Sequence, residues 1–547
     1  MPKLFSVTKK AGFSRFFYRF FRCNVAVFCS YGVNSLLLPR KSKTQLGTWL
    51  VLLFMFGASV AQANAKELVW GTAFHTEPQP IVDDLDTSRN FVNHLLFDPL
   101  FLSDQQGRIG LGLVTKWKII SPTQVQFELR DGVKFHSGNL LSAEDVEWTF
   151  QQINQQANLH TLFAPIKSLR AINRLQFEVQ TFRPFSQLIQ RLSLVFPVDK
   201  QFYLAQQQAE NGSHVVQISG TGAYKLSRYV PGIVTEFSVN PDYWRKREGN
   251  VSSIKVVPIK QVEMRMASLF SRDVDIIDHV PDSYVDLLNK DKQLSVIQTR
   301  GLKWLAIELN QHHPALAKRR VRQAINLAID NARLAEGLGP YAMASTQLSI
   351  PGQAGYNEEL LPRYNLLLAH QLLQQAGYAE GFSLSMAIPN SLFDEQSKVV
   401  SQLVSMLDRV NIRLVPSWLD EADYQANVSQ CLSDLVLTRR QKDAGNVLSI
   451  ARAMYLNDEL DEPKQATRCR VYQNEEVSEL ILAAEQELDG EQRAVIIREL
   501  EKVMYQQAAF VPLYWQRKIW ATNRRLDINS LNRNSLFPLF EHLQILD

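Results

Sequence analysis

Residues 301–330, GLKWLAIELNQHHPALAKRRVRQAINLAID, carry two hydrophobic periods in succession. Leu305, Ile307 and Leu309 alternate, which predicts a strand with little exposed surface. A helical spacing follows, and it gathers five apolar side chains on one face: Val321, Ala324, Ile325, Ala328 and Ile329. The other face, which is either solvated or lies between lobes, is expected to hold the polar residues Lys318, Arg319, Arg320, Arg322 and Gln323. The stretch therefore predicts a strand that turns at 310–314 and enters a helix, which indicates an α/β crossover but no function.

The composition is ordinary for a globular protein and does not favour nucleic-acid binding. The 547 residues include 59 Lys and Arg against 55 Asp and Glu. Nine of the basic residues and no acidic residue fall within 1–65, which leaves 50 basic against 55 acidic residues, a balance of −5, in the remainder. A basic surface for nucleic acid is therefore not expected, and the length predicts two or three domains.

Residues 1–65 predict an export leader. Two lysines precede an apolar run over 46–60, and the small-residue pattern AQANA follows at 61–65. The run is shorter than the roughly 20 residues that span a bilayer, which favours cleavage after Ala63 or Ala65 over an uncleaved membrane anchor. No cysteine directly follows the run, so a lipid anchor is not expected. The aromatic and basic residues before it indicate either an extension or a start site placed too far upstream.

Cys431 and Cys469 are the only cysteines beyond the leader. Export would place both in an oxidising compartment, where disulfides form and persist. A bond between them would close a loop of about 39 residues, worth about 4 kcal/mol in the chain-entropy model. Two unpaired, buried thiols are the alternative.

Strand and helix patterns alternate through the rest of the chain, which predicts an α/β or α+β class with more than one lobe. The motifs of P-loop proteins, zincins, serine hydrolases and EF-hands are absent. The glycine-rich segment 219–224 has its lysine at the wrong spacing for a phosphate loop, and a turn between two strands is predicted instead. His312 and His313 precede a proline, which favours a solvated turn over a metal site. No nucleophile with a base is evident, so no enzymatic activity is expected.

Six segments carry motifs that are modest alone but specific as an ordered set. They are VQFELRDGVKFHSG at 125–138, LSAEDV at 141–146, GTGAY at 220–224, NPDYW at 240–244, RVRQAINLAID at 320–330 and YNLLLAHQLLQQAGY at 364–378. Together they resemble extracytoplasmic solute-binding proteins of the dipeptide/oligopeptide type (solute-binding protein family 5), the receptors of ABC importers. The resemblance covers nearly all of residues 66–530.

The resemblance implies a two-lobed periplasmic binding protein fold (type II, cluster C) with an extra domain inserted in the N-terminal lobe. We expect lobe I at 66–92, 215–305 and 515–547, the inserted domain at 93–214, and lobe II at 306–514. The opening stretch then becomes the crossover between the lobes, with a hinge near 305–311. Such a fold captures a ligand by hinge closure, because contacts from both lobes stabilise the closed state.

The resemblance also implies ligand-binding residues in both lobes. In lobe I the loop after the first strand is expected to meet the ligand, through Phe74, His75, Thr76 and Glu77. In lobe II, peptide-binding members carry the pattern G-W-x-x-D-x-x-D-P, whose acidic residue holds the amino terminus of the peptide. The matching stretch here, LTRRQKDAG at 437–445, lacks the tryptophan.

Within that stretch Asp443 keeps one acidic position, while Arg440 falls near the other. A guanidinium at Arg440, with Arg439 beside it, favours an anionic ligand group such as a carboxylate or phosphate. A solvated basic loop is the alternative. Trp304 is a candidate to present an aromatic ring to the cleft, and a core tryptophan is the alternative there.

The combined expectation is a monomeric periplasmic receptor that captures a peptide or peptide-like solute for an ABC permease and ATPase complex. It needs no cofactor, metal or nucleic acid, and the leader shows no helix-turn-helix pattern. Within the family, a stand-alone ligand sensor and carriers of nickel, haem, oligosaccharide or antimicrobial peptides are alternatives. The 10 histidines show no cluster that favours metal or haem. An exported hydrolase is the alternative from another class, although no nucleophile supports it.

Overall fold

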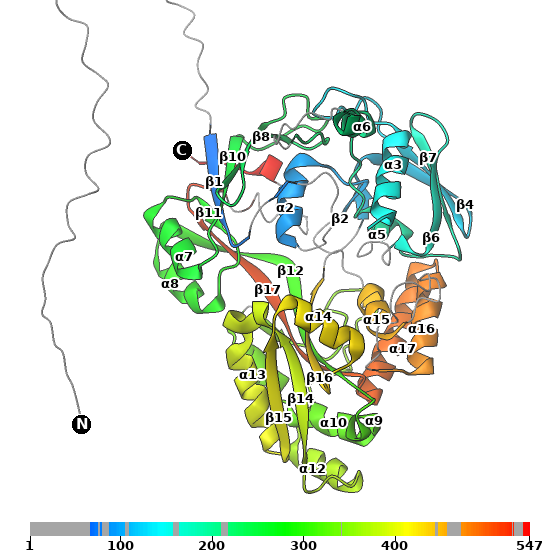
Figure 1. Cartoon of the computed structure of the whole chain (residues 1–547), viewed down its shortest axis with the longest axis vertical. Helices are drawn as coiled ribbons and strands as arrows, with labels where there is room; N and C mark the ends of the chain where they lie inside the picture. Colours follow the sequence, from blue (N-terminus) through cyan, green and yellow to red (C-terminus); the bar gives the residue numbers. More distant parts are fainter. Residues whose placement is uncertain are drawn as a thin grey trace, which may run out of the picture. The chain divides into compact units, whose positions relative to one another are not determined.

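The computed structural model (Figure 1) describes most of the chain beyond the leader. The described residues are 66–74, 77–78, 87–103, 109–156, 163–208, 217–340, 342–442, 447–456, 472–527, 529 and 540–546. They fall in one compact unit, Asn64–Asp547. No helix within these ranges is both long enough and apolar enough to cross a membrane. The predicted leader at 1–65 lies outside them.

The main sheet combines strands from distant parts of the chain. Its strands are β1 (Lys66–Thr72), β8 (Tyr224–Val230), β9 (Val234–Val239), β10 (Val251–Pro258), β11 (Ile276–Ile277), β12 (Leu294–Leu309), β13 (Ala342–Ala344), β14 (Phe382–Pro389), β15 (Ile412–Leu419), β16 (Leu435–Lys442) and β17 (Phe510–Asn523). Among the described residues they form an 11-stranded sheet in the order β15-β14-β16-β12-β17-β11-β1-β10-β9-β8, with β13 beside β17. The mixture of parallel and antiparallel pairs confirms the predicted α/β class.

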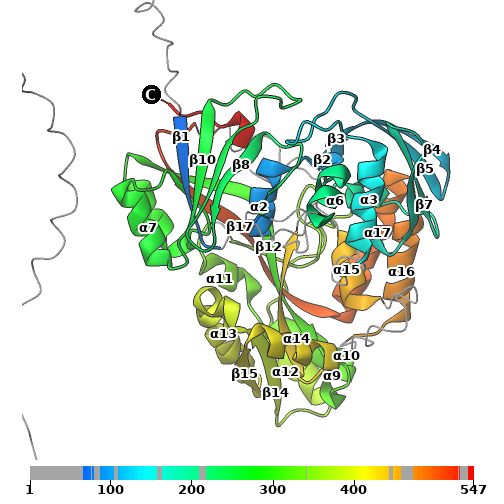
Figure 2. The same cartoon turned by 45° about the horizontal axis from the view of Figure 1, so that its top comes forward.

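The two longest strands of this sheet, β12 and β17, belong to both of its halves. They pair antiparallel from Leu294 opposite Asn523 to Glu308 opposite Phe510. The second half of β12 also pairs with β16, whereas the far end of β17 pairs with β11. Figures 1 and 2 show this pair running between the β1 side and the β14 side of the sheet.

The described helices lie on both sides of these strands and beyond them. They are α2 (Thr87–Leu96), α3 (Ala143–Asn154), α5 (Leu188–Leu192), α6 (Lys200–Gln208), α7 (Val262–Ser271), α8 (Val285–Lys290), α9 (Pro314–Ala317), α10 (Arg319–Ala328), α11 (Asn331–Glu336), α12 (Leu366–Gln375), α13 (Phe393–Asp408), α14 (Glu421–Gln430), α15 (Val447–Tyr455), α16 (Glu475–Gln486) and α17 (Gly490–Gln507). Short 3₁₀ turns occur at Asp282–Tyr284, Asn390–Leu392 and Phe540–His542.

The buried apolar clusters divide at the β12–β17 pair. Two clusters take their members from Trp304 to Trp515. One contains residues of β12, β14, β15, β16 and β17, and the other packs α15, α16 and α17 on β12 and β17. The other three clusters take all their members from residues before 300 or after 518. This division falls close to the lobe boundaries that we predict at 305/306 and 514/515, although the boundaries themselves remain a proposal.

A separate antiparallel sheet lies within the segment 93–214. Its strands β4 (Val114–Ser121), β5 (Gln124–Leu129), β7 (Gln176–Thr181) and β6 (Ile166–Ala171) are adjacent in that order, and β2 (Phe101–Ser103) pairs with β3 (Ile109–Leu111). Helix α3 begins with a capping box, in which the Asp145 carboxylate accepts the Ser142 N–H at 2.8 Å. Phe196, Val198 and Tyr203 from this segment pack with Trp70 of β1 in one apolar cluster.

The sequence motifs around 220 and 243 meet at one buried carboxylate, Asp98. It accepts hydrogen bonds from Thr221 Oγ1 (3.0 Å), the Tyr243 hydroxyl (2.9 Å) and the Trp244 indole N–H (2.8 Å). Arg245 lies 3.4 Å from the same carboxylate. The motifs therefore fix the connection between the segment 93–214 and the main sheet.

Residues 209–216, directly before the segment 219–224, lie outside the described ranges, so the turn between two strands stays a prediction there. The segment lies between α6 and β8, and it packs against the end of α2. A Cβ on Gly220 would lie 2.1 Å from the Leu96 carbonyl oxygen, and one on Gly222 would lie 2.4 Å from the Leu95 carbonyl oxygen. The glycines are needed because two backbones approach each other closely.

The opening stretch contains the predicted strand and helix. β12 begins at Leu294, earlier than its alternating pattern indicates, and α10 spans Arg319–Ala328. In the connection, His313 Nδ1 accepts the Ala315 N–H at 3.2 Å and caps the short helix α9. His313 therefore has a structural role in a surface turn, as its sequence context predicts.

Arg322 is a correction to the predicted solvated or interlobe face, because only 3% of it is exposed and its partners all belong to the predicted second lobe. Its guanidinium donates to the carbonyl oxygens of Gln507 (2.9 Å), Leu316 and Ala317 (both 3.0 Å). It also lies 5.3 Å from the centre of the Tyr472 ring. Helical periodicity predicts which residues share a face, but here the end of α17 buries only Arg322 among the five polar residues and is capped by its guanidinium.

Arg322→Met is expected to lower the free energy of unfolding by about 3 kcal/mol or more, because several buried carbonyl groups lose their donor. Urea denaturation followed by circular dichroism measures the change. Arg320→Met is the matched control: Arg320 is exposed on the same helix, and its replacement should change stability by less than about 0.5 kcal/mol. Equal effects of the two substitutions would contradict this role of Arg322.

Candidate functional site

The loop after β1, predicted to meet the ligand, starts beside the buried carboxylate of Asp278. Thr72 Oγ1 donates to Asp278 Oδ2 at 2.7 Å, and the Ala73 N–H donates to Asp278 Oδ1 at 3.0 Å. Phe74 is half-buried and packs edge-on against the His279 ring, with ring centres 4.7 Å apart. These contacts fix the direction in which the chain leaves the sheet.

His279 completes this cluster with a left-handed backbone, φ 51°, and its Nδ1 lies 3.2 Å from Asp278 Oδ1. Burial lowers the pKa of His279, and the charges of Lys303 and Lys518 lower it further, against the opposing effect of Asp278. Burial raises the pKa of Asp278, but the His279 ring and the two hydrogen bonds outweigh it and bring that pKa below its usual range. The pair is therefore a neutral imidazole beside a carboxylate at neutral pH.

Lys303 on β12 and Lys518 on β17 connect the two strands shared by both halves of the sheet with His279. Both lysines influence the charge state of His279. Lys303 lies opposite Gln441 of β16 on one side and opposite Gln516 of β17 on the other. His279, on which Phe74 of the loop after β1 packs, is thus influenced by the charge of Lys303, a residue of the β12 stretch that pairs with the end of β16. The loop and β16 belong to the two halves of the sheet.

Arg439 and Arg440 lie on opposite faces of β16. In the antiparallel ladder Arg439 lies opposite Leu305, and Arg440 lies opposite Trp304. Neighbouring residues of a strand point to opposite faces, so the register separates the two guanidinium groups. Arg439 is exposed, whereas Arg440 is half-buried.

Arg440 has a buried counter-ion in the neighbouring strand. Its Nη2 lies 3.4 Å from Oε1 of Glu308, whose side chain is 8% exposed. Glu308 follows Trp304 and Ala306 on one face of β12, the face that α15, α16 and α17 cover. Arg440 Nε has no hydrogen-bond partner among the described residues. Glu308 therefore neutralises part of the charge and leaves donor capacity on the guanidinium.

Trp304 belongs to the core. It has no exposed surface, its indole N–H donates to Ser345 Oγ at 3.1 Å, and its ring packs against Phe510 and Trp515. The core alternative is the one that the structure supports, and the side chain offers no surface to a ligand.

Fewer contacts are described for the other predicted site residues. Glu77 is exposed, and burial together with the charge of Glu77 raises the pKa of Tyr229 on β8. Cys431 is disulfide-bonded, while its pairing with Cys469 stays a prediction. The residues His75, Thr76, Asp443 and Cys469 lie outside the described ranges.

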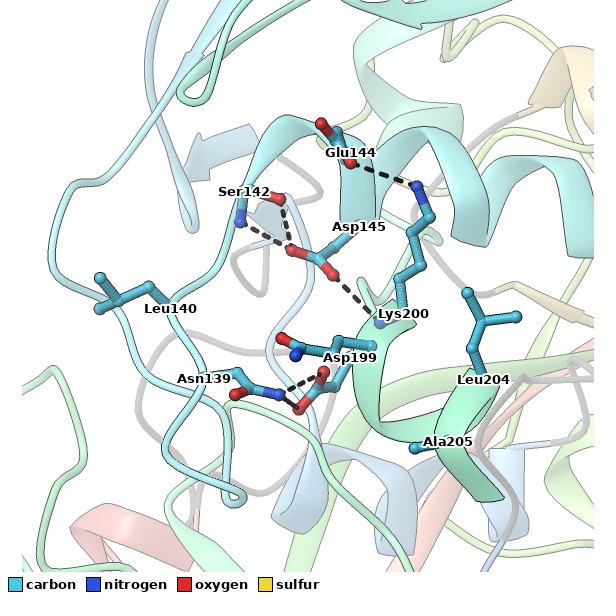
Figure 3. A pocket seen from close by; sticks show the side chains of 10 residues that line it. Asn139, Leu140, Ser142, Glu144, Asp145, Asp199, Lys200, Leu204 and Ala205 are labelled. Atoms are coloured by element: carbon cyan, nitrogen blue, oxygen red, sulfur yellow. Dashed lines mark hydrogen bonds and ion pairs between the residues drawn. The ribbon is translucent and has the colours of Figure 1, made fainter. Parts of the chain in front are cut away.

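Two cavities lie away from these residues. One, of about 510 Å³, lies where α3 and α6 begin (Figure 3). There Asp145 accepts the Lys200 N–H at 3.0 Å, and Asp199 accepts the Asn139 amide at 3.0 Å. These carboxylates cap helices and fix loops, so the polar lining has a structural explanation. The second, of about 490 Å³, lies beside β8, and neither cavity is lined by a predicted ligand residue.

Several site residues that the sequence did not single out are charges inside apolar strands. Glu308 interrupts the apolar run of β12, and Lys518 interrupts that of β17. Charged side chains are rarely buried without a partner, so each position carried a signal of a special environment. Asp278 and His279 follow a strand of only two residues and carried no such signal. No group of three or more potential metal ligands occurs among the described side chains.

The sequence of this chain matches a known family model. Residues 108–460 match the model described as "Bacterial extracellular solute-binding proteins, family 5 Middle", which covers more than half of the chain. The chain belongs to this family. The membership confirms the resemblance on which the two-lobed fold and the binding function were predicted.

Individual relatives are distant but cover nearly the same length. Glutathione-binding protein GsiB of Escherichia coli O1:K1 / APEC is 22% identical over 484 residues, 84% of this chain and 91% of the relative. DppA from Helicobacter pylori, solved in complex with the peptide STSA, has a TM-score of 0.73 at 19% identity and covers 88% of this chain and 98% of its own. AgaA from A. tumefacien R10, in complex with agropinic acid, has a TM-score of 0.72 at 19% identity, with 88% and 99% covered. The solved structures confirm the two-lobed periplasmic binding protein fold.

Glu308→Ala is expected to lower the free energy of unfolding by about 1–3 kcal/mol, because it leaves the half-buried Arg440 without its counter-ion. Arg440→Ala should cost a similar amount, and the double variant should cost less than the sum of the two. Urea denaturation of the four proteins gives the coupling energy. The exposed pair Lys502 and Glu499 provides the control cycle, with an expected coupling below about 0.5 kcal/mol. Additive effects at Glu308 and Arg440 would contradict a functional ion pair.

Proposed function

We propose that the protein is the periplasmic receptor of an ABC importer and captures a peptide or peptide-like solute by closing its two lobes. The carrying observation is that Phe74 of the loop after β1 packs on His279, whose pKa the charge of Lys303 on β12 lowers, while the end of β16 pairs with the same stretch of β12. The loop belongs to one half of the sheet and β16 to the other. A ligand that contacts both halves at this place stabilises the closed arrangement, since closure completes its binding site.

The ligand class follows from the family and from the charges of the site. One relative is named as a glutathione-binding protein, and two others were solved in complex with the peptide STSA and with agropinic acid. Glutathione and peptides carry free carboxylates, which a guanidinium binds through charge-assisted hydrogen bonds. We assign that contact to Arg440, which pairs with Glu308, and we assign a contact from the other half of the sheet to Phe74. The proposed set also includes Glu77 after β1 and Arg439 on the other face of β16, together with three residues outside the described ranges: His75, Thr76 and Asp443.

The partners follow from the same role. The leader directs export to the periplasm, the mature chain acts as a monomer, and an ABC permease and ATPase complex at the inner membrane accepts the ligand. Neither nucleic acid nor a catalytic reaction is part of this proposal, in which the chain is not an enzyme.

Native mass spectrometry of the protein purified from the periplasm is expected to show a bound peptide or glutathione-like molecule, released on mild unfolding. Isothermal titration calorimetry against glutathione, di- and tetrapeptides, an opine and Ni²⁺ then ranks the candidates. Binding of a peptide or peptide-like solute with release by its permease supports the proposal. Exclusive binding of nickel, haem or an oligosaccharide would contradict the ligand class.

Arg440→Gln is expected to weaken binding of a carboxylate-bearing ligand by about 10- to 100-fold, the equivalent of one charge-assisted hydrogen bond of about 1.5–3 kcal/mol. The carboxamide analogue of the same ligand should lose little. Calorimetric titration of both compounds measures the difference. Arg413→Gln, at an exposed position on β15, is the matched control. Equal affinities of the two variants for both compounds would refute the role of Arg440 without touching the receptor function.

A further inference from the structure

The segment before α5 touches the C-terminal turn of α16 through direct hydrogen bonds. The Ser186 N–H donates to the Glu485 carbonyl oxygen at 2.8 Å, and Ser186 Oγ donates to the Ala484 carbonyl oxygen at 3.2 Å. The last four carbonyl groups of a helix have no partner within it. These two receive donors from the inserted segment 93–214 instead. Figures 1 and 2 both place α16 beside the strands of that segment.

The Glu485 side chain is the centre of the same contact and is 1% exposed. Its Oε2 accepts Nη1 of Arg452, from α15, at 2.5 Å. Nη2 of Arg183, from the inserted segment, lies 3.7 Å from the same oxygen. One carboxylate is therefore shared by arginines from both sides of the contact.

Arg191 of α5 adds a third positive charge. It is 7% exposed and donates to Gln187 Oε1 at 3.2 Å. Burial lowers the pKa of Arg191 to about 10, while the charge of Glu485 opposes that shift and the charge of Arg452 adds to it. Without Glu485 the buried guanidinium groups would repel one another across the contact.

The energetics of such a cluster suit a contact that forms and separates. The desolvation of buried ions nearly offsets their attraction, so the closed contact gains little over a hydrated, separated one. The removal of one partner is different, because the remaining ions stay buried without compensation. A cluster of this kind fixes the geometry of the closed state but does not lock it.

We propose that Arg183, Ser186, Arg191, Arg452 and Glu485 form an interdomain latch that holds the inserted domain on the second lobe when the receptor is closed. The inference rests on the proposed function, since only a receptor that opens and closes needs a latch. The five residues include none of the predicted ligand contacts. The latch therefore tunes the balance between open and closed states and the residence time of the ligand, and recognition is left to the site on β12.

Glu485→Gln is expected to widen the separation of the two sides in the ligand-free protein. Spin labels at Lys118→Cys on β4 and Gln371→Cys on α12, both exposed positions, report the distance by electron paramagnetic resonance. Arg183→Ala removes a partly exposed partner from the other side, and it should shift the distances in the same direction even where Glu485→Gln disturbs folding. Glu499→Gln, an exposed glutamate on α17, is the control and should leave the distances unchanged.

With a ligand bound, Glu485→Gln should also raise the dissociation rate about three- to tenfold. Wider distances in Glu485→Gln and Arg183→Ala, but not in Glu499→Gln, support the latch. Unchanged distances in both variants overturn it. Because the distance measurement uses ligand-free protein, a failure to find a peptide-like ligand contradicts the proposed function but does not change the distances by which the latch is judged.

Discussion

The antiparallel pairing of β12 with β17 is the constraint on which the rest of the structure depends. Each strand continues from one half of the main sheet into the other, so every other strand is positioned relative to this pair. The ladder has register shifts between Thr299 and Leu302 and between Leu305 and Ala306. Missing ladder bonds make a strand pair easier to bend at that point. The second shift, between Leu305 and Ala306, falls at the start of the hinge that we predict at 305–311, and the first shift lies a few residues earlier in the strand.

The apolar clusters show to which half of the main sheet the inserted segment 93–214 is attached. Phe196, Val198 and Tyr203 pack into the same cluster as Trp70, which joins the inserted segment to the first lobe by hydrophobic burial. The buried Asp98 ties the two together again through side chains of both motifs. By contrast, the inserted segment and α16 share no apolar cluster among the described residues, and Arg183 and Ser186 contact α16 through polar groups. Hydrophobic burial is hard to undo, so the inserted domain is expected to move with the first lobe.

The sequence predicted the fold where one periodicity dominates, and it failed where tertiary contacts decide. The alternation at 305–309 and the helical spacing at 321–329 each reflect a face buried along a whole element, which local pattern captures. Arg322 looked solvated because its burial depends on the end of α17, with a hydrogen-bond partner 186 residues later in the chain. The sequence indicated which segments contain site residues, because family motifs pointed to Phe74 and Arg440. It did not indicate their contacts, since Glu308, Asp278 and Lys518 become partners only when distant strands pair.

The contrast between apolar and polar contacts bears on how a ligand can control this molecule. A large apolar interface between the lobes would favour closure whether or not a ligand is present, because burial of apolar surface does not depend on the ligand. A polar contact of low net energy, such as the Glu485 cluster, leaves the open and closed states close in free energy. The differential contacts of the ligand with both halves of the sheet then determine the equilibrium. The shared strands would then permit closure, and the weak polar contact would leave the open–closed equilibrium to be shifted by ligand binding.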